Sequence, residues 1–379
     1  MNRRSRHAPS PNRRDTAHAH STRTFRPAPR TLDYTVSALR AATCARPPHP
    51  FYRVVSVNVA PFEEMDMTAS PDKYSVLLAR CAGLPPVPTA VAHPCDVSSL
   101  TGALDAANLG LISPILVGPE EKIRSVAQEA NLSLDNVVIV NAPHSHAAAE
   151  RAVHAVRAGE AELLMKGSLH TDELLHEVAS GANGLRTERR LSHVFAMDVP
   201  TYHKPLFITD AAVNIFPKLA DKADIVRNAI DLVQALGIGT PKVAILAAVE
   251  TVSDKMPSTI DAAALCKMAD RGQITGGLLD GPLAFDNAIS AEAARIKGIT
   301  SPVAGDPDIL LVPDLEAGNM LAKQLTFLAG AEAAGIVLGA RVPIILTSRA
   351  DTVRSRIGSC AIAVLLAHAR RARMTAEAL

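Results

Sequence analysis

The segment Pro343-Ile-Ile-Leu-Thr-Ser-Arg-Ala-Asp-Thr-Val-Arg354 carries the pattern that decides the fold class. It begins as a short apolar run that ends at Leu346, turns through small polar residues and an arginine, and reaches Asp351, a residue type that caps helices. A short apolar run followed at once by a helix start is typical of a buried parallel strand that leads into a helix covering its sheet. The segment therefore predicts one strand–turn–helix unit of an α/β protein.

The same alternation extends from Pro71 to the C-terminus. The predicted strands are the short apolar runs Ile115–Val117, Val137–Val140, Leu163–Met165, Leu206–Thr209, Val243–Leu246, Gly277–Leu279, Ile309–Val312, Ile336–Leu338 and Ile344–Leu346. Helix starts are predicted at Ser98, at Pro119 with Glu120 and Glu121 behind it, at Ser258 and at Asp286. Strands and helices that alternate in this way predict a parallel α/β architecture.

Composition narrows the class of protein further. A chain of 379 residues with 48% hydrophobic and 20% charged residues can bury the cores of two domains. The net charge of +1 and the aromatic share of 3% give no reason to expect a nucleic acid as partner. Five cysteines without a CxxC pair indicate neither a disulfide framework nor a zinc site, so we expect a cytoplasmic protein. The apolar run from Ile357 to Ala367 is too short to cross a bilayer, and no membrane partner is expected.

Residues 1–70 have a different composition. They are rich in Arg, His and Pro, poor in acids, and contain no lysine before Lys73. A segment without a sustained apolar period cannot bury enough surface to offset the entropy of chain ordering, which predicts a basic disordered leader. Three interpretations of the leader stay open: a targeting peptide, a basic arm for a polyanion, and an extension ahead of a start at Met65 or Met67.

Ser348 and Arg349 lie in the turn after the last predicted strand, where ligands of open α/β sheets bind. Free backbone N–H groups at a helix start, the hydroxyls of Thr347 and Ser348, and the guanidinium of Arg349 together suit an oxyanion. The alternative is structural: Ser348 and Asp351 only cap the helix, and Arg349 is solvated.

Three further turns carry polar residues next to predicted strands. Lys166-Gly167 follows one strand, where the lysine either meets a phosphate or is solvated. Asp280-Gly281-Pro282 follows another and is expected to form a sharp turn, which either presents the carboxylate or has no further role. Gly318 and Asn319 lie early in a helix that starts near Asp314. A glycine there costs about 1 kcal/mol relative to alanine, which indicates close approach of backbone or ligand, or helix–sheet packing.

Several familiar motifs do not occur in the sequence: GxxxxGK[ST], GxGxxG after a strand, GxSxG and HExxH. His144 and His146 are expected to cap or flank a helix start rather than to bind a metal. Cys95 is expected to be a buried small residue rather than a nucleophile.

Taken together, six stretches in this order and spacing resemble the phosphate acetyltransferase/phosphate butyryltransferase family over about residues 72–372. The resemblance is to the branch found fused to, or beside, an enoyl-CoA hydratase domain. The stretches are Pro88-Thr-Ala-Val-Ala-His-Pro94, Leu164-Met-Lys-Gly167, Leu191-Ser-His-Val194, Leu278-Leu-Asp-Gly-Pro-Leu283, Val312-Pro-Asp-Leu-Glu-Ala-Gly-Asn319 and Leu346-Thr-Ser-Arg-Ala-Asp351.

The resemblance implies two three-layer α/β/α domains with mainly parallel sheets and an interdomain cleft, as in the isocitrate/isopropylmalate dehydrogenase fold. Residues 71–190 together with 339–379 would form the first domain, and residues 191–338 the second. The implied reaction moves an acyl group reversibly between coenzyme A and inorganic phosphate. It implies acyl-CoA and phosphate as partners, no metal or bound cofactor, and a homodimer.

The resemblance also implies roles for single residues. Ser348 would stabilise developing charge and Arg349 would hold phosphate or the end of coenzyme A. The positions implied for substrate binding are Lys166, Gly167, Ser192, Asp280, Gly281, Pro282, Gly318 and Asn319. The family's acetyl enzymes carry an aspartate seven residues after the serine, proposed as the general base, and that position is Ser355 here. Either Asp351 replaces this base or phosphate dianion needs little help.

Two rival functions share the predicted fold. A metal- and NAD-dependent dehydrogenase would need a cluster of carboxylates, of which Asp280 supplies one. A non-catalytic relative that binds coenzyme A or acyl phosphate would keep the cleft and lack the base, as Ser355 suggests. A further family arginine falls near His176, and both departures favour the butyryl-like branch.

Overall fold

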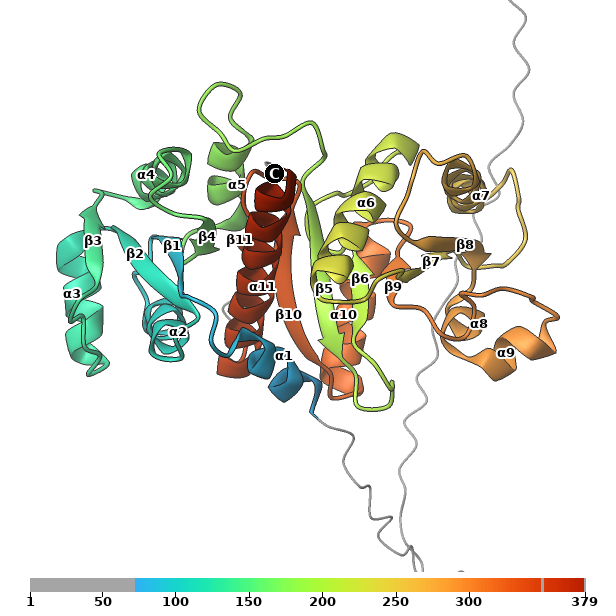
Figure 1. The fold of residues 1–379 in the computed structure, drawn as a ribbon, viewed down its shortest axis with the longest axis horizontal. Coiled ribbons are helices and arrows are strands. Elements are labelled where there is room, and N and C mark those ends of the chain that lie inside the picture. The colour runs from blue at the N-terminus through green and yellow to red at the C-terminus, as the bar shows by residue number, and fades with distance from the viewer. Residues whose placement is uncertain (1–71, 349–350, 378–379) are drawn as a thin grey trace, which may run out of the picture. The chain divides into compact units, whose positions relative to one another are not determined.

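A single 11-stranded sheet runs through the part of the chain that the computed structural model describes, residues 72–348 and 351–377 (Figure 1). The strand order is β3-β2-β1-β4-β11-β10-β5-β6-β9-β7-β8. The strands are β1 (Val87–Ala92), β2 (Ile112–Gly118), β3 (Val138–Asn141), β4 (Leu163–Lys166), β5 (Ser192–Asp198), β6 (Leu206–Thr209), β7 (Lys242–Leu246), β8 (Leu278–Leu283), β9 (Ile309–Leu311), β10 (Glu332–Leu338) and β11 (Ile344–Ile345). The predicted leader lies outside the described residues.

Helices connect most of the strands and cover the sheet. They are α1 (Lys73–Cys81), α2 (Val97–Asn108), α3 (Glu120–Glu129), α4 (Ser145–Arg157), α5 (Thr171–Ala179), α6 (Leu219–Ala235), α7 (Pro257–Asp270), α8 (Phe285–Ile289), α9 (Ala291–Ile296), α10 (Leu315–Leu328) and α11 (Val353–Glu377). Among the described helices, none is both long and apolar enough to span a bilayer.

Strand direction divides the sheet into two parallel sets. Strands β3, β2, β1, β4 and β11 run parallel to one another, and so do β6, β9, β7 and β8. Between the sets, β10 and β5 pair antiparallel with each other and with their outer neighbours. The carboxyl ends of β1, β4 and β11 therefore lie at one edge of the sheet, and those of β6, β9 and β7 lie at the opposite edge. The predicted mainly parallel α/β class is confirmed.

The two parallel sets correspond to different parts of the chain. Strands β1 to β4 and β11 come from residues 71–190 and 339–379, and the other strands come from residues 191–338. The sheet is continuous across the two parts through the pairing of β10 with β11. The division into two domains at these boundaries stays a prediction.

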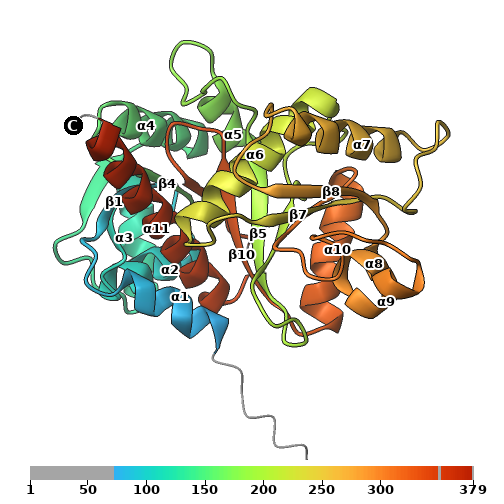
Figure 2. The same ribbon diagram turned by 45° about the vertical axis from the view of Figure 1, so that its right-hand side comes forward.

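Helices lie on both faces of the sheet and make three layers (Figures 1 and 2). On one face, α1, α2, α3, α6, α7 and α11 contribute to the largest apolar core. On the other face, α4 and α5 cover the first parallel set, and α8 and α10 cover part of the second, in two separate cores.

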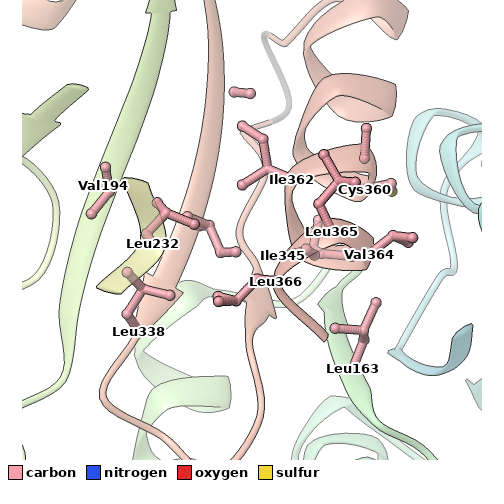
Figure 3. Packing of buried hydrophobic residues seen from close by; sticks show 14 of the residues in the cluster. Leu163, Val194, Leu232, Leu338, Ile345, Cys360, Ile362, Val364, Leu365 and Leu366 are labelled. Atoms are coloured by element: carbon pink, nitrogen blue, oxygen red, sulfur yellow. The ribbon is translucent and has the colours of Figure 1, made fainter. Parts of the chain in front are cut away.

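Helix α11 packs in the largest apolar core. Figure 3 shows Ile362, Leu365 and Leu366 of this helix beside Leu232 of α6 and Leu338 of β10. The apolar run 357–367 is buried throughout. Each buried Leu or Ile side chain stabilises the fold by about 1.5–3 kcal/mol. This packing holds the start of α11 in place beside the turn that carries Ser348.

Two strands, β1 and β5, are missing from the sequence-based prediction. β1 contains Pro88, and β5 begins with the buried polar residues Ser192 and His193, so neither is a continuous apolar run. Pro88 pairs with Ser113 of β2, but its carbonyl accepts the N–H of Glu162, so its backbone polar groups face the β4 side. Pairing with β4 begins only at Thr89, so no ladder N–H is required at the proline.

The predicted helix starts need small corrections. Ser98 does not cap α2: the Asp96 carboxylate accepts the backbone N–H of Ser99 at 2.7 Å. Helices α7 and α8 each begin one residue before the predicted Ser258 and Asp286. Aspartate and serine are both good caps, which explains the error at α2. Helices α7 and α8 follow Met256 and Ala284, which make no side-chain cap, so no cap residue marks their starts in the sequence.

The prediction of a sharp turn at Asp280-Gly281-Pro282 is wrong. Strand β8 continues through these residues to Leu283, with a cis peptide bond between Gly281 and Pro282. A Cβ on Gly281 would lie 2.7 Å from the carbonyl oxygen of Ile245. The glycine therefore allows close approach of β8 to β7, and this packing replaces the expected bend.

Candidate active site

The carboxyl ends of β1, β4 and β11 meet at one edge of the sheet. Ala92 of β1 lies opposite Lys166 of β4, and Met165 lies opposite Ile345 of β11. The residues that follow these strands therefore form neighbouring loops, in the position where parallel sheets bind ligands. Of the predicted site residues, Lys166, Gly167, Ser348 and Asp351 belong to these loops.

Gly167 makes the close approach of two of these loops possible. A Cβ at this position would lie 2.4 Å from the carbonyl oxygen of Ala92 and 2.5 Å from that of His93. The N–H of Gly167 donates to the Ala92 carbonyl at 2.9 Å. Only glycine fits here, so the loop after β4 is held directly against the loop after β1.

The turn from Ser348 to Asp351 connects β11 to α11. The backbone N–H of Ser348 donates to the Asp351 carboxylate at 2.6 Å. The start of α11 is capped instead by Thr352, whose Oγ1 accepts the N–H of Ser355 at 3.0 Å. The prediction that Asp351 caps the helix is therefore wrong, because the carboxylate faces back into the turn. Arg349 lies outside the described residues.

Two buried cations come close to this turn. Lys166 is 7% exposed and its Nζ donates to the Gly167 carbonyl at 3.2 Å. Arg356 is 6% exposed and donates to the Ser348 carbonyl at 3.4 Å. Two positive charges beside one turn raise the electrostatic potential there, which favours an anion over a cation at this place.

Asp351 interacts electrostatically with both of these cations. Burial raises the pKa of its carboxyl above the ordinary value, while the N–H of Ser348 and the charges of Arg356 and Lys166 oppose the rise. A half-buried carboxylate with a raised pKa, beside cations, has the properties of a general base. Arg356 itself is positioned by α2, because a Cβ on Gly102 would lie 2.8 Å from its Cδ.

His93 and Ser168 are polar residues at this edge that the sequence reasoning missed. His93 has a positive φ of 54°, which is uncommon outside glycine, and its Nδ1 lies 3.0 Å from the Ser168 hydroxyl. Ser168 Oγ also donates to the His93 carbonyl at 2.8 Å. Burial lowers the pKa of His93, which favours the neutral ring. Ser168 follows the predicted strand Leu163–Met165 closely, and this was a visible signal, whereas His93 had none because β1 was not predicted.

Other predicted site residues lie at the opposite edge of the sheet. Ser192 is fully buried and its Oγ accepts a hydrogen bond from Asn228 of α6 at 2.9 Å. Gly318 and Asn319 lie near the start of α10 and contact the turn after β6. A Cβ on Gly318 would lie 3.0 Å from the Asp210 carbonyl oxygen, and Asn319 donates to the Ala211 carbonyl at 3.1 Å. The glycine therefore lets the backbone of α10 approach the turn after β6 closely.

Asp210, which follows β6 directly, is the buried acid of that turn. Its carboxylate accepts the N–H groups of Ala212 and Val213 at 2.9 and 3.0 Å. Burial raises the pKa of Asp210, and these hydrogen bonds oppose the rise. The sequence reasoning did not single it out, although an acid at a strand end was visible.

The remaining predicted residues, Asp280, Gly281 and Pro282, lie in the outermost strand. Strand β8 is six positions away from β11 in the sheet order, or roughly 29 Å along the sheet. The structure therefore does not bring them next to Ser348. Asp280 accepts the N–H of Gly281 at 2.9 Å.

Residues with metal-binding potential have local roles in the structure. His144 caps α4 by accepting the N–H of Ala147 at 3.2 Å, as the sequence suggested. Cys95 is 5% exposed, and burial raises the pKa of its thiol to about 11. Within residues 72–348 and 351–377, no group of three or more His, Cys, Asp or Glu side chains is arranged to hold a metal ion.

The fold defines a mainly parallel α/β protein, with two buried cations close to the turn after one of its central strands. Residues 146–364 match the family model described as "Phosphate acetyl/butaryl transferase". The chain therefore belongs to the phosphate acetyl/butaryl transferase family, and it is an acyltransferase.

Similar proteins extend this match over most of the chain. A phosphate acetyltransferase from Rhizobium meliloti is 68% identical over 308 residues, which cover 81% of this chain and 98% of that protein. A phosphate butyryltransferase from Clostridium acetobutylicum is 44% identical over 278 residues, 73% of this chain and 92% of that protein. The crystal structure of a branched-chain phosphotransacylase from Enterococcus faecalis matches with a TM-score of 0.66 and 32% identity, covering 74% of this chain and 99% of that one.

Proposed function

We propose that the protein moves a short acyl group reversibly between coenzyme A and inorganic phosphate, at the turn from Ser348 to Asp351. The observation that carries the proposal is the approach of Lys166 and Arg356, both buried, to this turn. A site for phosphate needs positive charge and N–H donors, and a parallel strand end with a following helix supplies both. The family's phosphate acetyl- and butyryltransferases are named for this reaction.

The chemistry assigns a role to each part of the turn. A phosphate oxygen attacks the thioester carbonyl, the C–S bond breaks, and the proton of the phosphate ends on the coenzyme A sulfur. Ser348 and Arg349 would stabilise the charge that develops on the carbonyl oxygen and on phosphate. Asp351 would accept the phosphate proton and pass it on, in place of the base that Ser355 cannot supply.

The acyl chain requires an apolar space near the same turn. A cavity of about 130 Å³ lies beside the first turns of α11 and is lined by Ser355, Gly358 and Ile362 of that helix, with Phe207 and Ala334 of the sheet. An apolar cavity of about 150 Å³ can hold a benzene molecule. The cavity is therefore large enough for a butyryl or short branched chain, which we propose as the preferred acyl class.

The remaining features complete the proposal. Of the substrate-binding positions that the resemblance implies, we propose the two that lie beside this turn, Lys166 and Gly167. The others lie at the opposite edge of the sheet or in its outermost strand and are not proposed for the same site: Ser192, Asp280, Gly281, Pro282, Gly318 and Asn319. The two domains, 71–190 with 339–379 and 191–338, would flank the substrate. We further propose a cytoplasmic homodimer that uses acyl-CoA as substrate without a bound metal or cofactor.

Acyl phosphate formation tests the proposal directly. The full chain is incubated with butyryl-CoA and phosphate, and the phosphorus NMR spectrum is followed. A new acyl phosphate signal is expected, and its conversion back to phosphate on addition of coenzyme A shows reversibility. Binding of butyryl-CoA without any such signal would instead indicate the non-catalytic relative.

A further inference from the structure

We propose a second anion-binding site, separate from the Ser348 turn, in the cavity between α6 and the C-terminal half of α11. Its ligand would be a compact anion with two or more negative charges, of the polycarboxylate or polyphosphate class. The cavity lies near the carboxyl end of β10, whereas Ser348 lies near its amino end. Measured along α11, Arg370 is about 25 Å from the first helical residue.

Four arginines line this cavity, which has a volume of about 570 Å³. They are Arg189, Arg341, Arg370 and Arg373. Two come from α11, one from the segment before β5, and one from the turn after β10. The positive charge is therefore assembled from three separate parts of the chain.

The acids in the cavity do not balance these charges. Only Glu188 and Asp231 contribute negative charge to the lining described by the structure, so four arginines and two acids leave +2. Asp231 is already paired with Arg189 at 2.5 Å. Within the described residues, the guanidinium groups of Arg341 and Arg373 form no hydrogen bond or ion pair.

Arg370 shows the electrostatic cost of this arrangement. Its side chain donates to the Arg341 carbonyl at 3.2 Å. Burial lowers the pKa of Arg370, and the like charges of Arg189 and Arg373 lower it further, while Asp231 opposes them. Arg370 and Arg189 are half-buried, whereas Arg341 and Arg373 are exposed at the mouth of the cavity. Like charges around a half-buried arginine are unfavourable, and an anion would relieve the repulsion.

The dipole of α11 explains only part of the cluster. Cations near the C-terminus of a helix are stabilised by its macrodipole, which accounts for Arg370 and Arg373. Arg189 and Arg341 do not belong to α11, and the dipole gives no reason for them to line the same cavity. A multivalent anion accounts for all four residues.

Binding of citrate and of pyrophosphate tests the site. Each is titrated into the full chain by calorimetry, at constant ionic strength and without phosphate. The test variant is Arg341→Gln with Arg373→Gln, and the control is Arg271→Gln, which removes an exposed charge at the end of α7. We expect the double variant to bind at least about tenfold more weakly than the wild type and the control to be unchanged.

A fourth protein, Lys166→Gln, separates the two anion sites. If the second site exists, Lys166→Gln retains the affinity of the wild type for the better of the two probes. The comparison of citrate with pyrophosphate then decides between a carboxylate and a phosphate ligand. No binding by the wild type, equal affinity in the double variant, or loss of binding only in Lys166→Gln would overturn the proposal. The result does not depend on acyl transfer.

Discussion

The backbone N–H of Ser348 donates a 2.6 Å hydrogen bond to the carboxylate of Asp351, so the acid beside α11 faces the turn before the helix. Thr352 caps the helix in its place. The Asp351 carboxylate therefore lies among Ser348, Lys166 and Arg356, the groups of the proposed phosphate site.

Replacement of Asp351 by Asn removes the proposed base. Burial raises the pKa of Asp351 above the ordinary value of about 3.9. Only the deprotonated carboxylate can accept a proton, so wild-type activity should fall as the pH drops through this raised pKa. We expect Asp351→Asn to lower kcat by roughly 10²–10⁴-fold and to abolish this acid limb. Ser355→Ala is the control and should retain the wild-type kcat and the acid limb. An acid limb that persists in Asp351→Asn would exclude Asp351 as the general base.

Replacement of Lys166 by Gln weakens the proposed phosphate site. A hydrogen bond to a charged group contributes about 1.5–3 kcal/mol, so the KM for phosphate should rise roughly 10- to 100-fold. Lys255→Gln removes one exposed positive charge elsewhere and serves as the charge-matched control. Steady-state kinetics at varied phosphate concentration measures the KM of Lys166→Gln and of Lys255→Gln. The same KM in both variants would place phosphate elsewhere.

Gly358→Ala makes the apolar cavity beside α11 smaller. The added Cβ would lie 3.4 Å from the Ala334 Cβ and 3.6 Å from a Tyr74 ring carbon, which are ordinary contacts. Alanine also favours the helix by about 1 kcal/mol, so the variant should remain folded. If the acyl chain enters this cavity, kcat/KM for butyryl-CoA falls relative to acetyl-CoA. An unchanged ratio would show that the chain binds outside the cavity.

Gly167→Ala tests the contact between the loops after β1 and β4. The new Cβ would lie 2.4 Å from a backbone oxygen, which is far inside van der Waals contact. We expect the free energy of unfolding to fall by at least about 3 kcal/mol. In Gly181→Ala the new Cβ has no atom within 4 Å, so this control should remain near the wild type. Urea denaturation measures both, and equal midpoints would contradict the described loop geometry.

We expect the stability of the fold to depend on pH through the buried side chain of His193. Burial lowers the pKa of this residue to about 3, whereas it is about 6.5 in an unfolded chain. Below pH 6.5 the unfolded state therefore binds a proton that the folded state does not, and stability falls as the pH drops toward 3. Between pH 6.5 and 5 this group accounts for about 2 kcal/mol. Over this pH interval the free energy of unfolding of His193→Asn should fall by about 2 kcal/mol less than that of the wild type. An equal fall in both proteins would contradict a neutral, buried His193 ring.

Much of the fold could be predicted because its strands are short apolar runs. The runs at 206–209 and 344–346 coincide with β6 and overlap β11, and alternation with helices was enough for the fold class. β5 escaped prediction because Ser192 and His193 are polar yet buried, which depends on hydrogen bonds from distant residues. Strand β8 continues through Pro282 because it packs closely against β7, and the local sequence does not indicate this contact.

The candidate site was only partly visible in the sequence. Ser348, Asp351, Lys166 and Gly167 could be selected because each follows a predicted strand closely. The role of Arg356 could not, since it lies inside α11 and reaches the turn only by packing over Gly102. Asp351 matches the sequence of a helix cap, and only the three-dimensional turn shows that Thr352 takes this role.

Release of the coenzyme A thiol from butyryl-CoA by the full chain, with and without phosphate, tests the central claim most directly. We predict thiol release that requires phosphate, saturates as its concentration rises, and falls sharply in Ser348→Ala. Thiol release that is independent of phosphate, or no release from acetyl-, propionyl- or butyryl-CoA, would contradict it.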